Sequence, residues 1–192
     1  MILLIAAMVT TDLTFVRHAE TVANATGRYN SRTLNALSAK GEQQVVALTE
    51  RLAKLPRWDL ILVSPSPRAL KTIAPYLART RQKATVWPLL YECCTERPRQ
   101  PEAASFSFGA KIELPKALAP YFVVPANAKY PAPRNYGQGL AQVSATVAEF
   151  KRLYAGRRIL LVGHSAHGGQ FLRRLVGKAH HVKNATEIKV QF

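Results

Sequence analysis

Side chains able to bind or attack a phosphoryl group follow three short apolar runs of this sequence. They are Arg17-His18 after residues 13–16, Ser64 and Arg68 after residues 60–63, and His164-Ser165 after residues 159–162. The planar guanidinium group of arginine binds phosphate oxygens in a bidentate manner. A neutral imidazole can act as a nucleophile, and neighbouring guanidinium charges favour its neutral form. These residue types together point to phosphoryl-transfer chemistry.

The three apolar runs predict buried β-strands that bring these side chains together. The runs lead toward apolar residues at helical spacing in 45–55, 70–77 and 171–176, and a further apolar stripe covers 140–154. Strands that alternate with helices predict an α/β fold, here a three-layer α/β/α sandwich with a mostly parallel central sheet. In such sheets ligands bind outside the carboxyl ends of the strands, so we expect both histidines and both arginines at one edge.

Other segments complete the predicted organisation. Residues 86–89 predict another strand, residues 187–192 predict an edge strand, and Pro75 is expected to shorten or kink its helix. The Pro-rich stretch 95–139 reads as irregular, and we interpret it as an insertion or lid over the strand edge. The chain of 192 residues has the length of one domain, with residues 1–9 as a candidate extra N-terminal segment.

The chain is strongly basic, with 27 Lys and Arg residues against 11 acidic residues and a net charge of +16. A field of this sign favours anionic partners, which include phosphorylated metabolites, nucleic acid and acidic membrane surfaces. Aromatic residues are sparse among the basic ones, and no motif that reads nucleic acid is recognised. A small phosphorylated substrate is therefore the favoured partner over nucleic acid, and nothing in the sequence indicates an oligomeric state.

The sequence around these residues resembles the histidine phosphatase superfamily, in the branch that includes the cofactor-dependent phosphoglycerate mutases. Ala19 stands where the family usually has glycine, and the match covers most of the chain apart from residues 95–139. The likeness is carried by Phe15-Val16-Arg17-His18-Ala19-Glu20-Thr21, Asn24, Gly27-Arg28, residues 37–43, residues 64–72, Val162-Gly163-His164-Ser165 and Asn184-Ala185.

This resemblance implies a role for each matching residue of the phosphate site. His18 would be the nucleophile that becomes phosphohistidine. Arg17, Arg68 and His164 would line the phosphate pocket, and Asn24 would be a further phosphate ligand.

The proton donor of this branch follows the pattern Leu, any residue, Glu after the third strand. Leu90-Tyr91-Glu92 fits that pattern, which makes Glu92 the expected general acid. The family commonly has a glycine shortly after this glutamate, whereas this chain has Cys93-Cys94-Thr95. Glu96 is therefore the reserve candidate for the acid.

Three other readings of the residues around His164 are disfavoured. The acid phosphatase branch has Asp after its second histidine, whereas Ser165 follows His164 here. A serine hydrolase elbow, Gly-x-Ser-x-Gly, fails because His167 replaces its second glycine, and because Glu187, the only acid after Ser165, lies beyond every histidine. A metal site on His164 and His167 lacks a supporting carboxylate or cysteine cluster.

We therefore expect a phosphomonoesterase that needs no metal or other cofactor and acts through phosphohistidine on a small phosphorylated metabolite. A phosphoglycerate mutase-type phosphotransferase would share the same catalytic residues, but the chain is short for that group. A basic protein that binds nucleic acid or an acidic surface, on a degenerate phosphatase fold, is the second alternative.

Residues 95–139 are expected to select the substrate. Arg28 is a further candidate for a substrate contact, with ordinary solvation as an equal alternative. An apolar lid, or else part of the core, would come from Phe106, Phe108, Tyr121, Phe122, Tyr130 and Tyr136, and a second anionic group could meet Arg97, Arg99, Lys129 or Arg134.

Cysteine usage and the N-terminal segment indicate a cytoplasmic protein. A bond between the adjacent Cys93 and Cys94 would be strained, so we expect two reduced thiols. The apolar run 2–9 lacks the basic residues of a signal peptide and is too short to span a bilayer. A periplasmic or secreted location would follow if it belonged to a signal segment, and Met8 is an alternative start.

Overall fold

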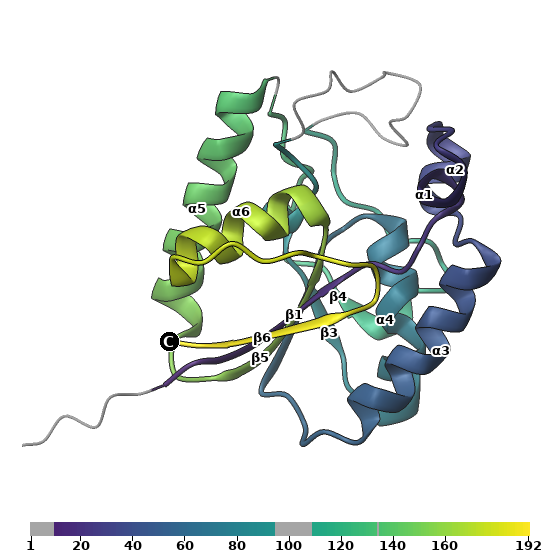
Figure 1. The fold of residues 1–192 in the computed structure, drawn as a ribbon, viewed down its shortest axis with the longest axis horizontal. Helices are drawn as coiled ribbons and strands as arrows, with labels where there is room; N and C mark the ends of the chain where they lie inside the picture. Colours follow the sequence, from purple (N-terminus) through teal and green to yellow (C-terminus); the bar gives the residue numbers. More distant parts are fainter. Residues whose placement is uncertain (1–9, 95–108, 134) are drawn as a thin grey trace, which may run out of the picture.

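A computed structural model describes residues 10–94, 109–133 and 135–192, which form a six-stranded sheet with helices on both faces (Figure 1). The strands are β1 (Asp12–Arg17), β2 (Leu60–Val63), β3 (Ala84–Val86), β4 (Phe122–Val123), β5 (Arg158–Gly163) and β6 (Glu187–Gln191). The helices are α1 (Val22–Thr26), α2 (Ser31–Asn35), α3 (Ala39–Ala53), α4 (Pro67–Thr80), α5 (Tyr136–Tyr154) and α6 (Ser165–Val176), with short 3-10 helices η1 (Pro88–Leu90) and η3 (Ala119–Tyr121). The predicted three-layer α/β/α architecture is confirmed.

The strands lie in the order β4-β3-β2-β5-β1-β6. All neighbouring pairs are parallel except β1 with β6, which is antiparallel. The three runs predicted from the sequence are the adjacent central strands β2, β5 and β1, and the predicted C-terminal edge strand is β6. Because β2, β5 and β1 run in the same direction, their carboxyl ends meet at one edge of the sheet.

Both faces of the sheet are buried, which explains why its central strands are continuous apolar runs. Leu160 and Val162 of β5 belong to the core under α3 and α4, whereas Ile159 and Leu161 belong to the core under α5 and α6. Figure 1 shows these two helix pairs on opposite sides of the sheet. In the described part of the chain, no helix combines the length and the apolar character needed to cross a bilayer.

Helix α4 begins with Pro67 and continues through Pro75 to Thr80, so the shortening expected at Pro75 is wrong. Proline suits the first position of a helix because the N–H that it lacks has no partner there. Pro75 lies on the exposed side of α4, while Ile73 and Leu77 are fully buried on the side that faces the sheet. Burial of that apolar face compensates for the backbone hydrogen bond that proline cannot make.

Two predictions about the middle of the chain need correction. The strand expected at 86–89 ends at Val86, because Pro88 begins the 3-10 helix η1. Residues 95–108 and 134 of the predicted insertion lie outside the described residues. The rest of it is partly regular, since β4 pairs with β3 and buries Phe122 in the core under α3 and α4. This part of the segment extends the sheet.

Candidate active site

The adjacent ends of β1, β5 and β2 bring His18, His164 and Ser64 together. Arg17 is opposite Gly163 in the β1–β5 register, and the backbone N–H of His18 donates to the Gly163 carbonyl at 2.9 Å. The ring centroids of His18 and His164 are 5.3 Å apart. Two histidines separated by most of the chain therefore lie next to each other at this edge of the sheet.

His18 is 4% exposed and is held in one tautomer. Its Nδ1 lies 2.8 Å from the Ala19 carbonyl oxygen, which can only accept, so Nδ1 carries the proton and Nε2 keeps its lone pair. Burial holds the pKa of His18 well below its usual value, and the charges of Arg68 and Arg17 act in the same direction. The ring is therefore neutral at neutral pH, as a nucleophilic imidazole must be.

The loop after β1 is held by two side chains whose contributions the sequence reasoning missed. Thr72 Oγ1 accepts a hydrogen bond from the Ala19 N–H at 2.9 Å and donates to the Arg68 carbonyl at 2.7 Å. Asn184 Nδ2 donates to the His18 carbonyl at 2.8 Å. Thr72 could have been found from its spacing, because it lies one helical turn after Arg68.

His164 is fully buried and bonds to Arg68 through one ring nitrogen and to a serine through the other. Its Nδ1 lies 3.1 Å from Arg68 Nη2, and arginine can only donate, so Nδ1 accepts. Its Nε2 then donates to Ser64 Oγ at 2.7 Å, with Ser66 Oγ at 3.2 Å. Burial, followed by the charge of Arg68, holds the pKa of His164 well below its usual value. A neutral His164 thus orients the guanidinium group of Arg68.

Arg17 and Asn24 supply further donors near His18. Burial lowers the pKa of Arg17, while attraction to Glu92 acts in the opposite direction, and an arginine remains cationic at neutral pH. Asn24 Oδ1 accepts the Thr21 N–H at 3.2 Å as part of the N-terminal cap of α1. With Oδ1 used in this way, the Nδ2 group of Asn24 is the part able to donate to an anion.

Glu92 follows η1 and meets the first turn of α6. Its Oε1 accepts the backbone N–H of His167 at 2.9 Å, and its attraction to Arg17 links it to the same group of side chains. The reserve candidate, Glu96, lies outside the described residues. The ring of His167 is fully buried, with Nε2 3.1 Å from Thr146 Oγ1, and burial lowers the pKa of His167 to about 3. Within the described residues, no group of three or more His, Cys, Asp or Glu side chains is placed to hold a metal ion.

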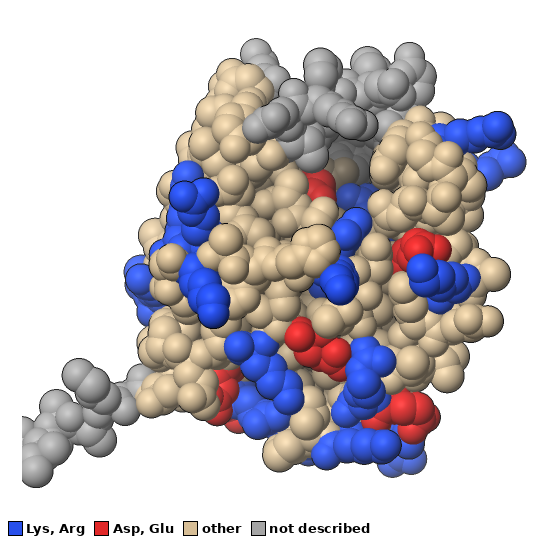
Figure 2. All heavy atoms as spheres, in the orientation of Figure 1, with Lys and Arg blue, Asp and Glu red and all other residues tan. Residues whose placement is uncertain are grey.

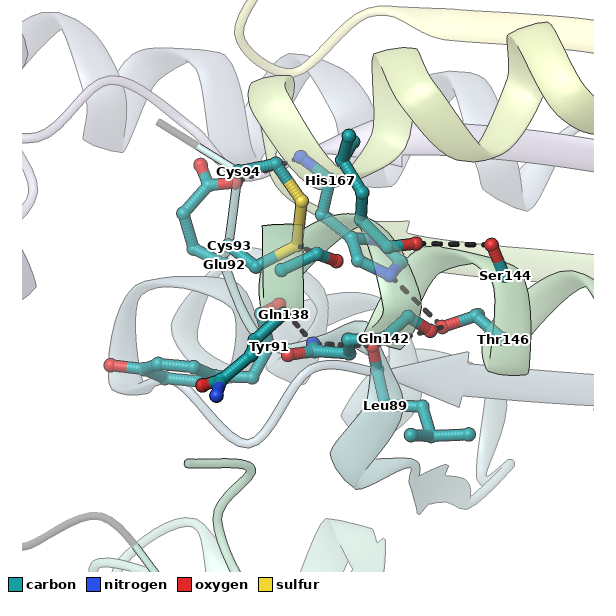
Figure 3. Close-up of a disulfide and its surroundings, with 12 residues drawn as sticks. Leu89, Tyr91, Glu92, Cys93, Cys94, Gln138, Gln142, Ser144, Thr146 and His167 are labelled. Carbon is teal, nitrogen blue, oxygen red and sulfur yellow. Dashed lines mark hydrogen bonds between the residues drawn. A yellow bond between two sulfur atoms is a disulfide. The ribbon is translucent and has the colours of Figure 1, made fainter. Parts of the chain in front are cut away.

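Cys93 and Cys94 form a disulfide directly after Glu92 (Figure 3). The expectation of two reduced thiols is wrong, and the cytoplasmic location loses the support that free thiols would have given it. The Cα atoms are 3.8 Å apart, and the Cys94 backbone takes a left-handed conformation with φ of 65°. The pair packs against Gly139 of α5, where an added Cβ would lie 3.2 Å from Cys94 Sγ. The disulfide between adjacent residues closes a small ring. That ring is accommodated by the local backbone conformation and by close packing on α5, neither of which can be read from residue spacing.

The residues proposed to select the substrate fall into three groups: some are part of the core, some are exposed, and some lie outside the described residues. Phe122 and Tyr130 are buried in the core under α3 and α4, and Tyr121 packs against it, so these three aromatic residues are core. Tyr136, Lys129 and Arg28 are exposed. The candidates outside the described residues are Phe106, Phe108, Arg97, Arg99 and Arg134.

The positive charge of the chain is not gathered at one place on the face drawn in Figure 2. Basic side chains there lie over several elements, with acidic side chains among them. A continuous basic stripe, the usual footprint of a nucleic-acid site, is not visible on that face.

Comparisons with known proteins agree with this arrangement. The model of the histidine phosphatase superfamily (branch 1) matches residues 13–190. No curated protein sequence matches the chain.

Three similar solved structures are phosphatases by name, and at 15–20% sequence identity they share the fold of this chain. The α-ribazole phosphatase of Shigella flexneri has a TM-score of 0.63 at 20% identity, covering 93% of this chain and 89% of its own. A phosphoserine phosphatase variant of Entamoeba histolytica, in complex with phosphoserine, has a TM-score of 0.59 at 15% identity, covering 93% and 89%. A mycobacterial glucosyl-3-phosphoglycerate phosphatase has a TM-score of 0.56 at 20% identity, covering 93% and 90%.

Proposed function

Because the chain belongs to branch 1 of the histidine phosphatase superfamily, we propose that it is a phosphomonoesterase that acts through a phosphohistidine intermediate on a small phosphorylated metabolite. The observation that carries this proposal is the state of His18. Its Nδ1 is engaged by the Ala19 carbonyl, its ring is neutral, and Arg17 and Arg68 are close enough for their charges to lower its pKa. A nucleophilic nitrogen beside two guanidinium groups suits attack on a phosphate ester.

In the first step, Nε2 of His18 forms a bond to phosphorus while the bond from phosphorus to the ester oxygen breaks. Glu92 donates a proton to that oxygen, and the alcohol leaves. Arg17, Arg68 and Asn24 hold the phosphoryl oxygens, and the two guanidinium groups balance their charge. His164 contributes by keeping the guanidinium group of Arg68 in place through Nδ1. Removing one such contact is expected to cost on the order of a hundredfold in rate.

In the second step, the Glu92 carboxylate removes a proton from water, which attacks phosphorus. The bond between phosphorus and Nε2 breaks, inorganic phosphate leaves, and His18 returns to its neutral state. Each group ends as it began, so neither step consumes a metal ion or other cofactor. This is the ping-pong sequence that a nucleophile and a single acid–base group together allow.

The test is hydrolysis of an aryl phosphate in the presence of EDTA. We expect wild-type protein to release phosphate, and His18→Ala to lose this activity. His181→Ala, a substitution of an exposed histidine, is the matched control and should keep it. Full activity of the His18→Ala variant would refute the proposal.

Substrate class is tested by a panel of phosphate esters. α-Ribazole 5′-phosphate, phosphoserine and glucosyl-3-phosphoglycerate enter the panel because similar structures are named for them. Mutase activity is measured in the same samples as isomerisation of phosphoglycerate. Isomerisation faster than phosphate release would replace hydrolysis with phosphotransfer as the main reaction.

A further inference from the structure

The segment that carries Glu92 is tied to helix α5 by one glutamine side chain. Gln142 Nε2 donates to the carbonyl oxygens of Leu89 and Tyr91, each at 2.9 Å (Figure 3). Carbonyl oxygens can only accept, so both amide hydrogens are used and the orientation of the amide group is determined. Gln142 is only 8% exposed, which shields both hydrogen bonds from competition by solvent.

The two carbonyls held by Gln142 lie at critical points of the backbone. Leu89 is inside η1, and the peptide of Tyr91 leads directly into Glu92. The chain becomes extended at Tyr91, with φ of −60° and ψ of 145°, so no continuing helix restrains it there. The amide of Gln142 therefore holds the last peptide before the carboxylate residue.

The carboxylate of Glu92 is held by His167 of α6, and His167 in turn contacts α5. Glu92 Oε1 accepts the N–H of His167, and the ring of His167 meets Thr146, one turn after Gln142. Thr146 Oγ1 also lies 3.3 Å from the Leu89 carbonyl oxygen. The backbone before Glu92 and the carboxylate itself are thus held by a single frame of α5 and α6 side chains and backbone (Figure 3).

We propose that Gln142 is a positioning residue that sets the carboxyl group of Glu92 against the leaving oxygen of the substrate. The inference rests on the proposed function and on Glu92 as the proton donor. General acid catalysis requires the acid within hydrogen-bond reach of the leaving oxygen, and a misplacement of about 1 Å can cost on the order of a hundredfold in rate. The hydrogen bonds of the Gln142 side chain go to the Leu89 and Tyr91 carbonyls and not to a phosphate-binding group. Its removal is therefore expected to affect protonation of the leaving group and to leave phosphate binding intact.

The test compares two substrates for the Gln142→Leu variant. p-Nitrophenyl phosphate has a leaving group that departs without protonation, whereas a simple alkyl phosphate needs its leaving oxygen protonated. The readout is kcat/KM, which reports the step that forms phosphohistidine. We expect Gln142→Leu to lower kcat/KM roughly ten- to a hundredfold for the alkyl ester and less than about threefold for the aryl ester.

Gln82→Leu is the matched structural control. Gln82 is also partly buried, and it donates to a backbone carbonyl, that of Trp58, at 3.1 Å, but it lies beyond the far end of α4 from the site. Its substitution should change kcat/KM for both esters by the same factor. Should Gln142→Leu fail to fold, Gln142→Asn retains the amide with a shorter reach and is compared in the same way.

Glu92→Gln separates the possible failures. If the wild-type protein hydrolysed neither ester, the proposed function itself would be refuted. If Glu92→Gln lowered kcat/KM equally for both esters, Glu92 would not be the general acid, and this inference would fail with it. A selective loss for Glu92→Gln together with equal losses for Gln142→Leu would overturn the role of Gln142 alone.

Discussion

Thr72→Val removes a hydroxyl group from behind the loop that carries His18 and leaves the shape of the side chain nearly unchanged. In the native protein this hydroxyl accepts the Ala19 N–H at 2.9 Å and donates to the Arg68 carbonyl at 2.7 Å. Thr72 and Ala19 are both fully buried, so water cannot replace the lost acceptor. The substitution therefore leaves a buried backbone donor without a partner.

The expected cost follows from that orphaned donor. An unsatisfied buried N–H destabilises a protein by about 1–3 kcal/mol. With a urea m-value of roughly 2 kcal/mol/M, a loss of about 2 kcal/mol lowers the urea midpoint by about 1 M. Phosphatase activity should fall as well, because Ala19 directly follows the proposed nucleophile.

Thr49→Val is the matched control within the same protein. The hydroxyl of Thr49 is buried in α3, and among the described residues it has no hydrogen-bond partner. Replacing it with a methyl group should leave the urea midpoint unchanged or raise it, since a buried unpaired hydroxyl is itself unfavourable. Equal effects of the two substitutions on the midpoint, measured by circular dichroism, would refute the reasoning.

Three other predictions concern pH, packing and oxidation state. The pKa values of the three buried histidines near the site, His18, His164 and His167, are lowered on folding, so below about pH 6.5 the unfolded chain binds more protons than the folded one. Each histidine should then reduce the free energy of unfolding by up to about 1.4 kcal/mol for every pH unit by which the pH falls. Urea midpoints that do not change between pH 7 and pH 5 would contradict this. Gly168→Ala should lower the melting temperature, because its Cβ would lie 2.1 Å from the Phe15 ring, whereas Gly169→Ala has open space and should raise it by removing a helix glycine. Protein purified without reductant should show no reactive thiol on denaturation, and two after treatment with a dithiol, because Cys93 and Cys94 are the only cysteines; two thiols before treatment would exclude the disulfide.

The sequence by itself determined the layers of this protein and the edge at which its chemistry is proposed to take place. Apolar runs of strand length and apolar stripes of helical period are local properties, and a core on both faces of a parallel sheet follows from them. His18 and His164 could be placed together because the carboxyl ends of parallel strands share one edge. Arg68 could be added to them because it lies in the first turn of the helix that follows the strand at residues 60–63.

The tertiary structure alone decided which partners hold those side chains. The contacts of Ala19 with Thr72, and of Leu89 and Tyr91 with Gln142, join residues more than fifty positions apart, and they depend on how closely α4 and α5 approach the loops beside them. The tautomer of His18 and the ring of Cys93 and Cys94 depend on backbone geometry at single peptides. Such contacts are decided to within a few tenths of an ångström by packing, and the order of residue types along a chain does not carry that information.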